Sequence, residues 1–184
     1  MSRAWKRVSS VLDSERPGFR ILHEQFESGR TGALIDATIV QSPDWVNVLP
    51  LTPDHDVVLI RQYRFGAIGS TLEIPGGLID PGEEPGTAAA RELREETGYR
   101  CERITSLGSV APNPAFMRNR LHMFVAEGCV LDGAQEQDPG EDIAVELHPY
   151  SSMDLLIARG AMDHALAQIA FQRLALLRAG HSLA

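Results

Sequence analysis

The sequence predicts an α/β protein in which helices cover both faces of a mixed β-sheet, an α/β/α sandwich, with a small antiparallel β-sheet ahead of it. Three patterns lead to this prediction. Apolar and polar residues tend to alternate over the first forty residues, which is typical of half-buried strands. Residues 56–63 contain the apolar run VVLI, as expected for a strand in the centre of a sheet. Near the C-terminus, apolar residues recur at helical spacing: Leu166, Ile169, Ala170, Leu174 and Leu177.

Strands account for most of the first half of the chain. The N-terminal segment is expected to form two or three antiparallel strands with turns at Gly29 and Gly32. Residues 1–43 therefore form a predicted N-terminal β-sheet region, and residues 44–184 the predicted main domain. The strands expected in the main sheet are residues 45–51, 56–63, 71–74, 104–110, 121–126 and 143–147.

Helices are expected at three places. The first begins at residues 85–87, after an Asp-Pro-Gly turn, and ends at Gly98, a typical residue for a helix C-terminus. The residues expected to pack it on the sheet are Ala89, Ala90, Leu93 and Thr97. A short helix is expected at residues 151–159, and Asp163 is expected to cap the last helix.

The composition excludes some classes of function. The chain has 184 residues, of which 43% are hydrophobic and 23% charged, ordinary values for one well-buried domain. A net charge of -8 argues against a nucleic-acid partner, which would require a basic face. No segment approaches the roughly 20 consecutive apolar residues of a membrane helix. Cys101 and Cys129 are far apart and expected to be free thiols, so a cytoplasmic protein is expected.

Three glutamates of the first predicted helix suggest a metal site. Glu92, Glu95 and Glu96 occur at spacings of three and four, so their carboxylates share one stripe of the helix. Like charges so placed destabilise a helix by roughly a few tenths of a kcal/mol per pair. At contact distance near a protein surface, the bare repulsion reaches about 4 kcal/mol. A hard divalent cation with oxygen ligands would offset this cost.

The residues around this stripe form a pattern that resembles the Nudix hydrolase signature. Its fixed positions are occupied by Gly77, Glu83, Arg91, Glu92, Leu93, Glu95, Glu96 and Gly98. Tyr99 occupies a position that is usually aliphatic. The resemblance implies the Nudix fold and hydrolysis of a nucleoside diphosphate linked to another group, with Mg²⁺ or Mn²⁺. The alternative interpretation is a surface helix with a solvated acidic face.

The resemblance also implies roles for these residues. The implied metal ligands are Glu92, Glu95, Glu96 and the Gly76 carbonyl. Gly76 and Gly77 lack a Cβ, which lets the backbone approach the ion. Arg91 is expected to pair with one of the glutamates or with Glu83. The motif residues expected to have a structural role are Gly77, Glu83, Arg91 and Gly98.

Attack of water on phosphorus requires a base. In many Nudix enzymes the motif itself supplies this base, and in the ADP-ribose pyrophosphatase branch a loop after the motif supplies it. Residues 136–142 (EQDPGED) form such an acidic loop before a predicted strand. Glu141 is the predicted base or metal-proximal acid, and a solvated acidic hairpin is the alternative.

The flanking segments resemble the ADP-ribose or nucleoside diphosphate sugar pyrophosphatase branch. These segments are residues 42–48, 61–64, 72–77 and 111–116. By this resemblance Arg64 grips the diphosphate, unless it only forms a surface salt bridge. Glu73 is a candidate to orient the ribose or a metal-bound water. Further candidates for substrate binding are Arg61, Arg120 and Trp45, which either stacks on the base or packs against the strand.

The predicted function is Mg²⁺-dependent cleavage of ADP-ribose or a related nucleoside diphosphate sugar into a nucleoside monophosphate and a sugar phosphate. One alternative is a Nudix hydrolase acting on dinucleoside polyphosphates or nucleoside triphosphates. A second is a non-catalytic Nudix module that senses a ligand. In the resembling branch the N-terminal sheet is commonly exchanged between two subunits, so a homodimer is expected, without a nucleic-acid or membrane partner.

Overall fold

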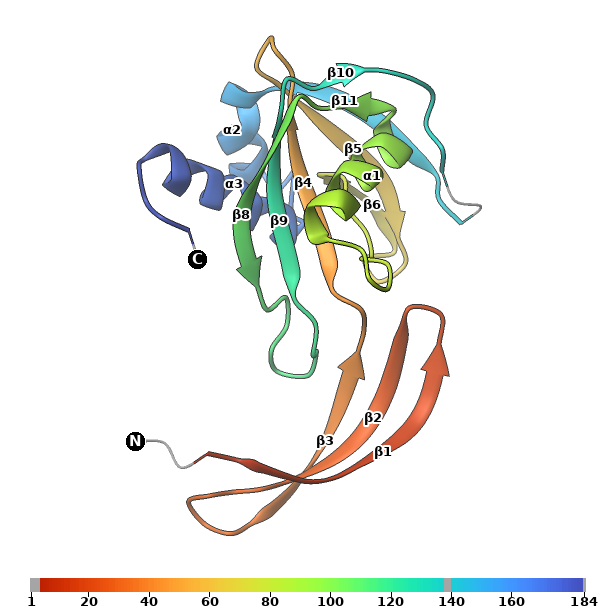
Figure 1. Cartoon of the computed structure of the whole chain (residues 1–184), viewed down its shortest axis with the longest axis vertical. Coiled ribbons are helices and arrows are strands. Elements are labelled where there is room, and N and C mark those ends of the chain that lie inside the picture. Colours follow the sequence, from red (N-terminus) through yellow and green to blue (C-terminus); the bar gives the residue numbers. More distant parts are fainter. Residues whose placement is uncertain (1–3, 138–139, 184) are drawn as a thin grey trace. The chain divides into compact units, whose positions relative to one another are not determined.

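The computed structural model describes residues 4–137 and 140–183, which divide into two compact units. The first unit contains the described residues up to Asp44 together with Ala111–Arg120. The second contains Trp45–Val110 and the described chain from Leu121 onward. The elements of both units are labelled in Figure 1.

The first unit is a three-stranded antiparallel sheet. Its strands, in spatial order, are β1 (Lys6–Arg16), β2 (Phe19–Glu27) and β3 (Leu34–Gln41). The turn predicted at Gly32 is present, with a φ of 70°. The segment Ala111–Arg120 joins this sheet through β3: the Val40 amide donates to the Phe116 carbonyl at 2.8 Å, and the Arg118 amide donates to the Val40 carbonyl at 3.0 Å.

The second unit contains a six-stranded sheet in the order β11-β5-β4-β9-β8, with β6 paired to β5. Its strands are β4 (Trp45–Leu51), β5 (Asp56–Arg64), β6 (Gly69–Glu73), β8 (Arg103–Val110), β9 (Leu121–Glu127) and β11 (Ile143–Pro149). Strands β4 and β9 are parallel, and the other pairs are antiparallel. Two short strands, β7 (Tyr99–Arg100) and β10 (Val130–Leu131), pair separately. The predicted mixed sheet is therefore confirmed.

Helices cover both faces of this sheet (Figure 1). Helix α1 (Pro85–Thr97) packs on one face, and α2 (Met153–Ala158) and α3 (Ala165–Arg178) pack on the other. A 3₁₀ turn, η1 (Tyr150–Ser152), leads into α2. The α/β/α sandwich predicted from the sequence is present.

Two details of the helices were predicted wrongly. Helix α3 begins one residue later than predicted, with His164 in extended conformation as its N-cap and no side-chain capping bond. On α1, Ala90 was expected to be buried but is exposed, whereas Ala88 is buried. The helix is rotated because Glu92 and Glu96, which are also buried, face inward beside Ala88.

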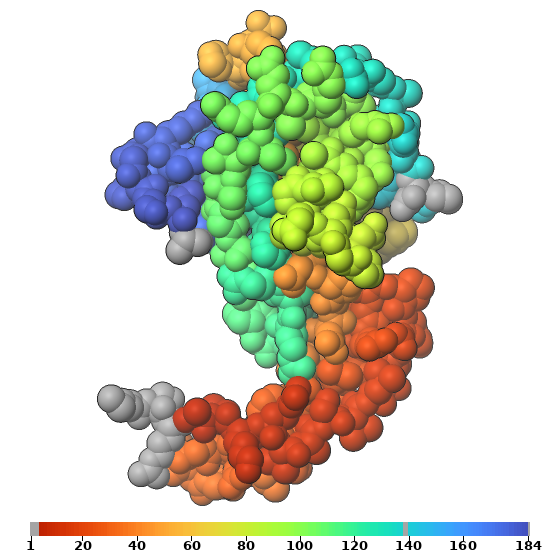
Figure 2. Space-filling model, in the orientation of Figure 1, coloured from red at the N-terminus to blue at the C-terminus, as the bar shows by residue number. Residues whose placement is uncertain are grey.

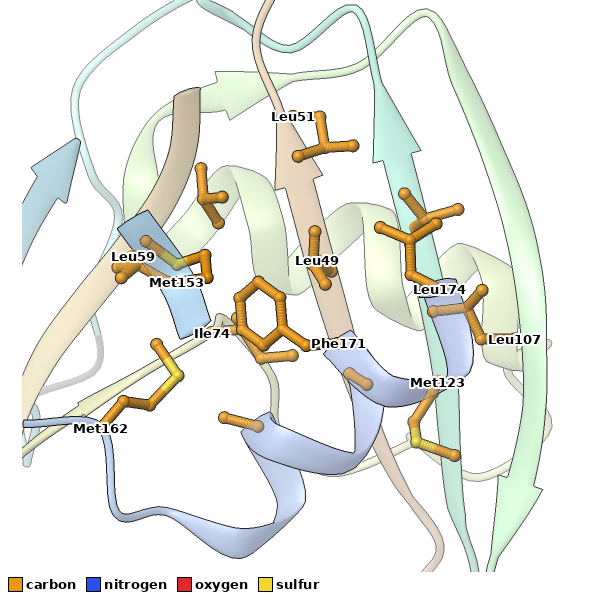
Figure 3. Packing of buried hydrophobic residues seen from close by; sticks show 14 of the residues in the cluster. Leu49, Leu51, Leu59, Ile74, Leu107, Met123, Met153, Met162, Phe171 and Leu174 are labelled. Atoms are coloured by element: carbon orange, nitrogen blue, oxygen red, sulfur yellow. The ribbon is translucent and has the colours of Figure 1, made fainter. Parts of the chain in front are cut away.

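The main hydrophobic core lies between the sheet and helices α2 and α3. Figure 3 shows Leu49 of β4 near Phe171 of α3 and Leu59 of β5 near Met153 of α2, and all four belong to one buried cluster. A smaller core on the opposite face contains Val46, Val48, Ala88, Ala89 and Leu93. Successive residues of β4 thus alternate between the two cores, as the geometry of a strand requires.

A gap in the sheet determines where the motif lies. Strands β4 and β5 pair only at one end, where Leu51 is opposite Val57. The segment after β6 takes the place of β5 along the rest of β4. There, the Val48 amide donates to the Pro75 carbonyl and the Val46 amide donates to the Gly77 carbonyl, both at 2.9 Å. The glycine loop is therefore held on a central strand.

The two cysteines are free thiols, as predicted. Cys129 is buried and Cys101 is half-buried. Burial raises the pKa of the Cys129 thiol to about 12, so it remains protonated and unreactive. Within the described residues, none of the helices is long and apolar enough to cross a bilayer.

Candidate active site

Two glycines bring the loop after β6 into close contact with both β4 and α1. A Cβ on Gly76 would lie 2.2 Å from the Val46 carbonyl oxygen and 2.5 Å from Asn47 Oδ1. A Cβ on Gly77 would lie 2.5 Å from Glu92 Oε1. These separations are far below van der Waals contact, so the backbone and the carboxylate can approach this closely only because both residues lack side chains.

The Arg91 guanidinium binds three glutamates of the motif. Its Nε and Nη2 atoms each donate to the Glu83 carboxylate at 3.0 Å. Its Nη1 atom donates to Glu92 at 2.8 Å and to Glu95 at 2.9 Å. Nη2 also donates to the Leu78 carbonyl at 3.0 Å. The pairing predicted for Arg91 is present, and it links the loop to the helix.

Within the described residues, no arginine is hydrogen-bonded to Glu96, although the charge of Arg64 acts to lower its pKa. Glu96 is 2% exposed, and one carboxylate oxygen accepts a bond from the Gly76 amide at 2.9 Å. Burial raises the pKa of Glu96 to about 8; the Gly76 bond opposes this shift, and the charges of Glu92 and Glu141 add to it. Burial also raises the pKa of Glu92, although Arg91 opposes the shift. Glu92 is thus partly compensated by Arg91, whereas the largest influence opposing burial at Glu96 is the bond from the Gly76 amide.

An acidic cavity of about 490 Å³ is lined by the residues predicted to bind metal and to act as base. Its carboxylate lining consists of Asp80, Glu92, Glu95, Glu96, Glu136 and Glu141. The charge of Glu141 contributes to the raised pKa values of Glu92 and Glu96, so the loop acid lies close to the motif. Asp138 and Pro139 of the predicted acidic loop lie outside the described residues. In Figure 2, the yellow-green segment that contains α1 lies at the surface of the second unit.

The donor set of this cavity fits a hard divalent cation. Carboxylate oxygens are the ligands that such ions prefer, and a cation beside Glu92 and Glu96 would oppose the effect of burial, which raises their pKa values. Within the described residues, no three His, Cys, Asp or Glu side chains are arranged to hold a metal ion as they stand. Arg91 accounts for part of this, because it draws Glu92 and Glu95 toward its own guanidinium.

Arg64 and Glu73 form a two-point pair at the edge of the acidic cavity. Arg64 Nε donates to Oε1 and Nη2 donates to Oε2, both at 2.8 Å. Burial would raise the pKa of Glu73, but bonds from Arg64 and Thr71 hold it below its ordinary value. The pair uses one N–H of Nε and one of Nη2, so both N–H groups of Nη1 and the second N–H of Nη2 are donors outside the pair.

A second cavity, of about 410 Å³, adjoins the acidic one and contains Trp45 in its lining. The remaining predicted binding residues lie elsewhere. Arg61 pairs with Glu146 of β11, with Nε 2.5 Å from Oε1, and Arg120 belongs to the first unit. Neither is among the described residues that line the two cavities.

Two residues of the second cavity, Asn47 and His164, were missed in the sequence. Asn47 carried a signal, because it is the one polar residue in the apolar strand WVNVLPL and is 9% exposed. His164 carried none. It precedes a helix far along the chain, and only the fold brings it within 3.5 Å of Glu73.

Comparison with known proteins agrees with this geometry. Residues 42–169 match the NUDIX domain. The chain is 34% identical to the ADP-ribose pyrophosphatase of Bacillus subtilis (strain 168) over 127 residues, which cover 68% of this chain and 69% of that protein. It is 42% identical to the methanol dehydrogenase activator of Bacillus methanolicus over 90 residues, 49% of each chain. It is 32% identical to an ADP compounds hydrolase of Escherichia coli (strain K12) over 111 residues, 60% of this chain and 59% of that one.

A solved structure, titled "Crystal structure of ADP compounds hydrolase", has the same fold. It superposes with a TM-score of 0.83 and covers 96% of this chain and 95% of its own, at 23% sequence identity. The chain spans only about half of the methanol dehydrogenase activator, since the match covers 49% of that protein. Because the domain match covers most of the chain and includes both the glycine loop and the glutamate helix, the chain belongs to the Nudix family.

Proposed function

We propose that this Nudix protein is a Mg²⁺-dependent pyrophosphatase. Its proposed substrate is ADP-ribose or a related nucleoside diphosphate sugar, which it cleaves to a nucleoside monophosphate and a sugar phosphate. The observation that carries this proposal is the meeting of Glu92, Glu95, Glu96 and Glu141 around one cavity, with Arg64 in its wall. The relatives named for ADP-ribose and ADP compounds support the substrate class.

The metal would be held by motif residues. Mg²⁺, or Mn²⁺ in its place, suits the carboxylates of Glu92, Glu95 and Glu96 and the carbonyl of Gly76. When bound, it neutralises diphosphate oxygens and lowers the pKa of a bound water. The carbonyls of Pro75 and Gly77 accept bonds from β4, so the Gly76 carbonyl between them is directed away from that strand.

Other side chains position the reactants. Glu141 takes the proton from the attacking water, a role supported by its position in the wall of the cavity that also contains Glu92, Glu95 and Glu96. Arg64 binds the diphosphate through Nη1 while Glu73 holds its other edge. Arg91 keeps the loop on the helix, which makes it a positioning residue.

We also propose that the protein acts as a homodimer. The N-terminal sheet and the residue that precedes β1 expose several large apolar side chains: Trp5, Val8, Val11, Leu12, Leu34 and Ile35. A three-stranded sheet with this much exposed apolar surface gains stability by pairing with a second copy. Sedimentation equilibrium at micromolar concentration tests this proposal, and a monomer mass would contradict it. A cytoplasmic location is proposed because Cys101 and Cys129 are free.

A substrate panel tests the proposed activity. ADP-ribose, several nucleotide sugars, nucleoside triphosphates and dinucleoside polyphosphates are each incubated with Mg²⁺ and with a chelator. We expect metal-dependent turnover of the diphosphate sugars. Turnover of triphosphates or dinucleoside polyphosphates alone would support the alternative hydrolase, and tight binding without turnover would support a ligand-sensing module.

A further inference from the structure

The cavity of about 410 Å³ beside the acidic one has a different chemical character. Trp45 and Leu166 contribute apolar walls, whereas Asn47, Glu73 and His164 contribute polar groups. The lining shared with the acidic cavity consists of Arg64, Gly76, Gly77 and Leu78. A molecule whose diphosphate lies at Arg64 therefore reaches directly into this second cavity.

Asn47 is a buried amide with an unsatisfied donor. It is 9% exposed, and its Nδ2 atom has no hydrogen-bond partner among the described residues. The residues two positions before and after it in β4, Trp45 and Leu49, belong to the core on the α3 face. Side chains two positions apart in a strand point to the same face, so Asn47 lies on that face as well. An unpaired buried donor costs about 1–3 kcal/mol. Stability alone therefore gives no reason for an amide at this position.

His164 presents the complementary group. Its Nε2 atom lies 3.5 Å from Glu73 Oε2. Because an ionised carboxylate only accepts, we assign the hydrogen of the neutral ring to Nε2. The Nδ1 atom is then an acceptor, and it too is buried without a partner in the described chain. Burial lowers the pKa of His164, with Glu73 opposing and Arg64 adding to the shift, which keeps the ring neutral.

A donor and an acceptor on one cavity match a hydroxyl group, which both accepts and donates. Apolar walls such as Trp45 suit the C–H face of a ring that carries such groups. We propose that this cavity is the subsite for a sugar ring joined to the diphosphate, and that Asn47 and His164 bind its hydroxyl groups. This inference rests on the proposed function. Either the nucleoside ribose or the sugar at the other end of the diphosphate would present this chemistry.

The chain contains a matched control for His164. His148 lies with its Nε2 atom 3.0 Å from Glu146, and Glu146 in turn pairs with Arg61. The two histidine side chains are equally exposed, at 27%. His148 is not among the described residues that line either cavity. The two His–Glu–Arg groups thus differ in their position relative to the proposed subsite.

Steady-state kinetics with deoxy substrates test the proposal. The variants Asn47→Ala, His164→Ala, His164→Gln and His148→Ala are assayed with ADP-ribose and with two analogues, one lacking a hydroxyl on the nucleoside ribose and one lacking a hydroxyl on the terminal ribose. We expect Asn47→Ala and His164→Ala to raise KM for ADP-ribose about tenfold with a smaller change in kcat. We expect His164→Gln to recover part of this loss and His148→Ala to match the wild type.

The analogues identify the ring that is bound. The wild type should discriminate about tenfold against the analogue that lacks the bound hydroxyl, and Asn47→Ala or His164→Ala should lose that discrimination. This ratio is taken within one variant, so general damage to the fold cancels. Variants that discriminate as the wild type does would overturn the subsite.

Binding measurements separate this proposal from the proposed activity. Calorimetric titration with ADP-ribose in chelator reports affinity without turnover. If the wild type turns nothing over but binds ADP-ribose about tenfold more tightly than Asn47→Ala and His164→Ala, the activity is wrong and the subsite stands. If turnover is present and both variants bind and react as the wild type does, the subsite is wrong and the activity stands. Absence of both binding and turnover would contradict both.

Discussion

Glu24 of the first unit and Glu96 of the second each expose only 2% of their surface, yet the bond from Arg118 is the largest influence on the pKa of Glu24, whereas burial is the largest influence on that of Glu96. Glu24 accepts two bonds from Arg118, at 3.0 and 2.5 Å, one from Ser10 at 2.9 Å and one from Arg7 at 3.1 Å. The bonds from Arg118 outweigh burial and lower the pKa of Glu24 to about 2. Glu96, which accepts from the Gly76 amide, has a pKa raised to about 8.

The comparison shows that burial alone does not decide what a carboxylate does. A buried carboxylate with enough cationic donors stabilises the fold, because its charge is compensated inside the protein. A buried carboxylate without them is destabilising by itself and is suited to bind a cation from solution. Glu24 is an example of the first kind and Glu96 of the second.

The largest effect is expected for Glu96→Gln. Loss of a proposed metal ligand should reduce kcat by roughly a thousandfold, on the scale of the several kcal/mol that a metal ion contributes to the transition state. The free energy of unfolding should stay the same or rise, because the neutral amide carries no penalty for burying a charge. Turnover assays and urea unfolding measure both quantities. Full activity would remove Glu96 from the metal site.

Glu141→Gln should separate the loop acid from the motif glutamates. The expected loss is about a hundredfold in kcat, which is typical of a removed general base, with substrate affinity largely kept. Single-turnover kinetics and binding in chelator distinguish these two parameters. Unimpaired turnover would place the base within the motif.

Glu24→Gln should lower the free energy of unfolding, in contrast to Glu96→Gln. An amide cannot compensate two guanidinium groups, so the first unit should lose about 2 kcal/mol of unfolding free energy; partial exposure of Arg7 and Arg118 limits the loss. The control is Glu15→Gln, because the Glu15–Arg20 pair is more than half exposed and should contribute under about 0.5 kcal/mol. Hydrogen exchange of strands β1 to β3 measures both. Equal effects would show that burial of Glu24 does not matter.

A smaller, graded effect is expected from acid. The pKa of Glu24 is about 2 in the folded protein and 4.5 ordinarily, so its stabilising contribution is fully present above pH 4.5. It is lost progressively as the pH falls from 4.5 toward 2, because the unfolded state binds the proton first. Exchange rates of β2 amides, each divided by the intrinsic exchange rate at the same pH, should rise as the pH falls through this range in the wild type and change less in Glu24→Gln. Identical profiles would contradict the low pKa.

The sequence predicted the parts of the site that depend on local order. The spacing from Gly77 to Gly98 predicted the loop and helix, and the pairing of Arg91 was predicted from the resemblance to the Nudix signature. The rotation of α1, which buries Ala88 and exposes Ala90, could not be predicted, because it depends on what the helix packs against. The approach of His164 to Glu73 joins distant segments that no local pattern relates.

The membership of Ala111–Arg120 in the first unit limits how the chain can be shortened. A chain that starts at Trp45 would lack Val40, which bonds to Phe116, and Glu24, which pairs with Arg118. It would keep Phe116 and Arg118. The connection from β8 to β9 would then expose backbone groups and a guanidinium whose partners had been removed. Removal of the N-terminal strands would therefore require a different β8–β9 connection.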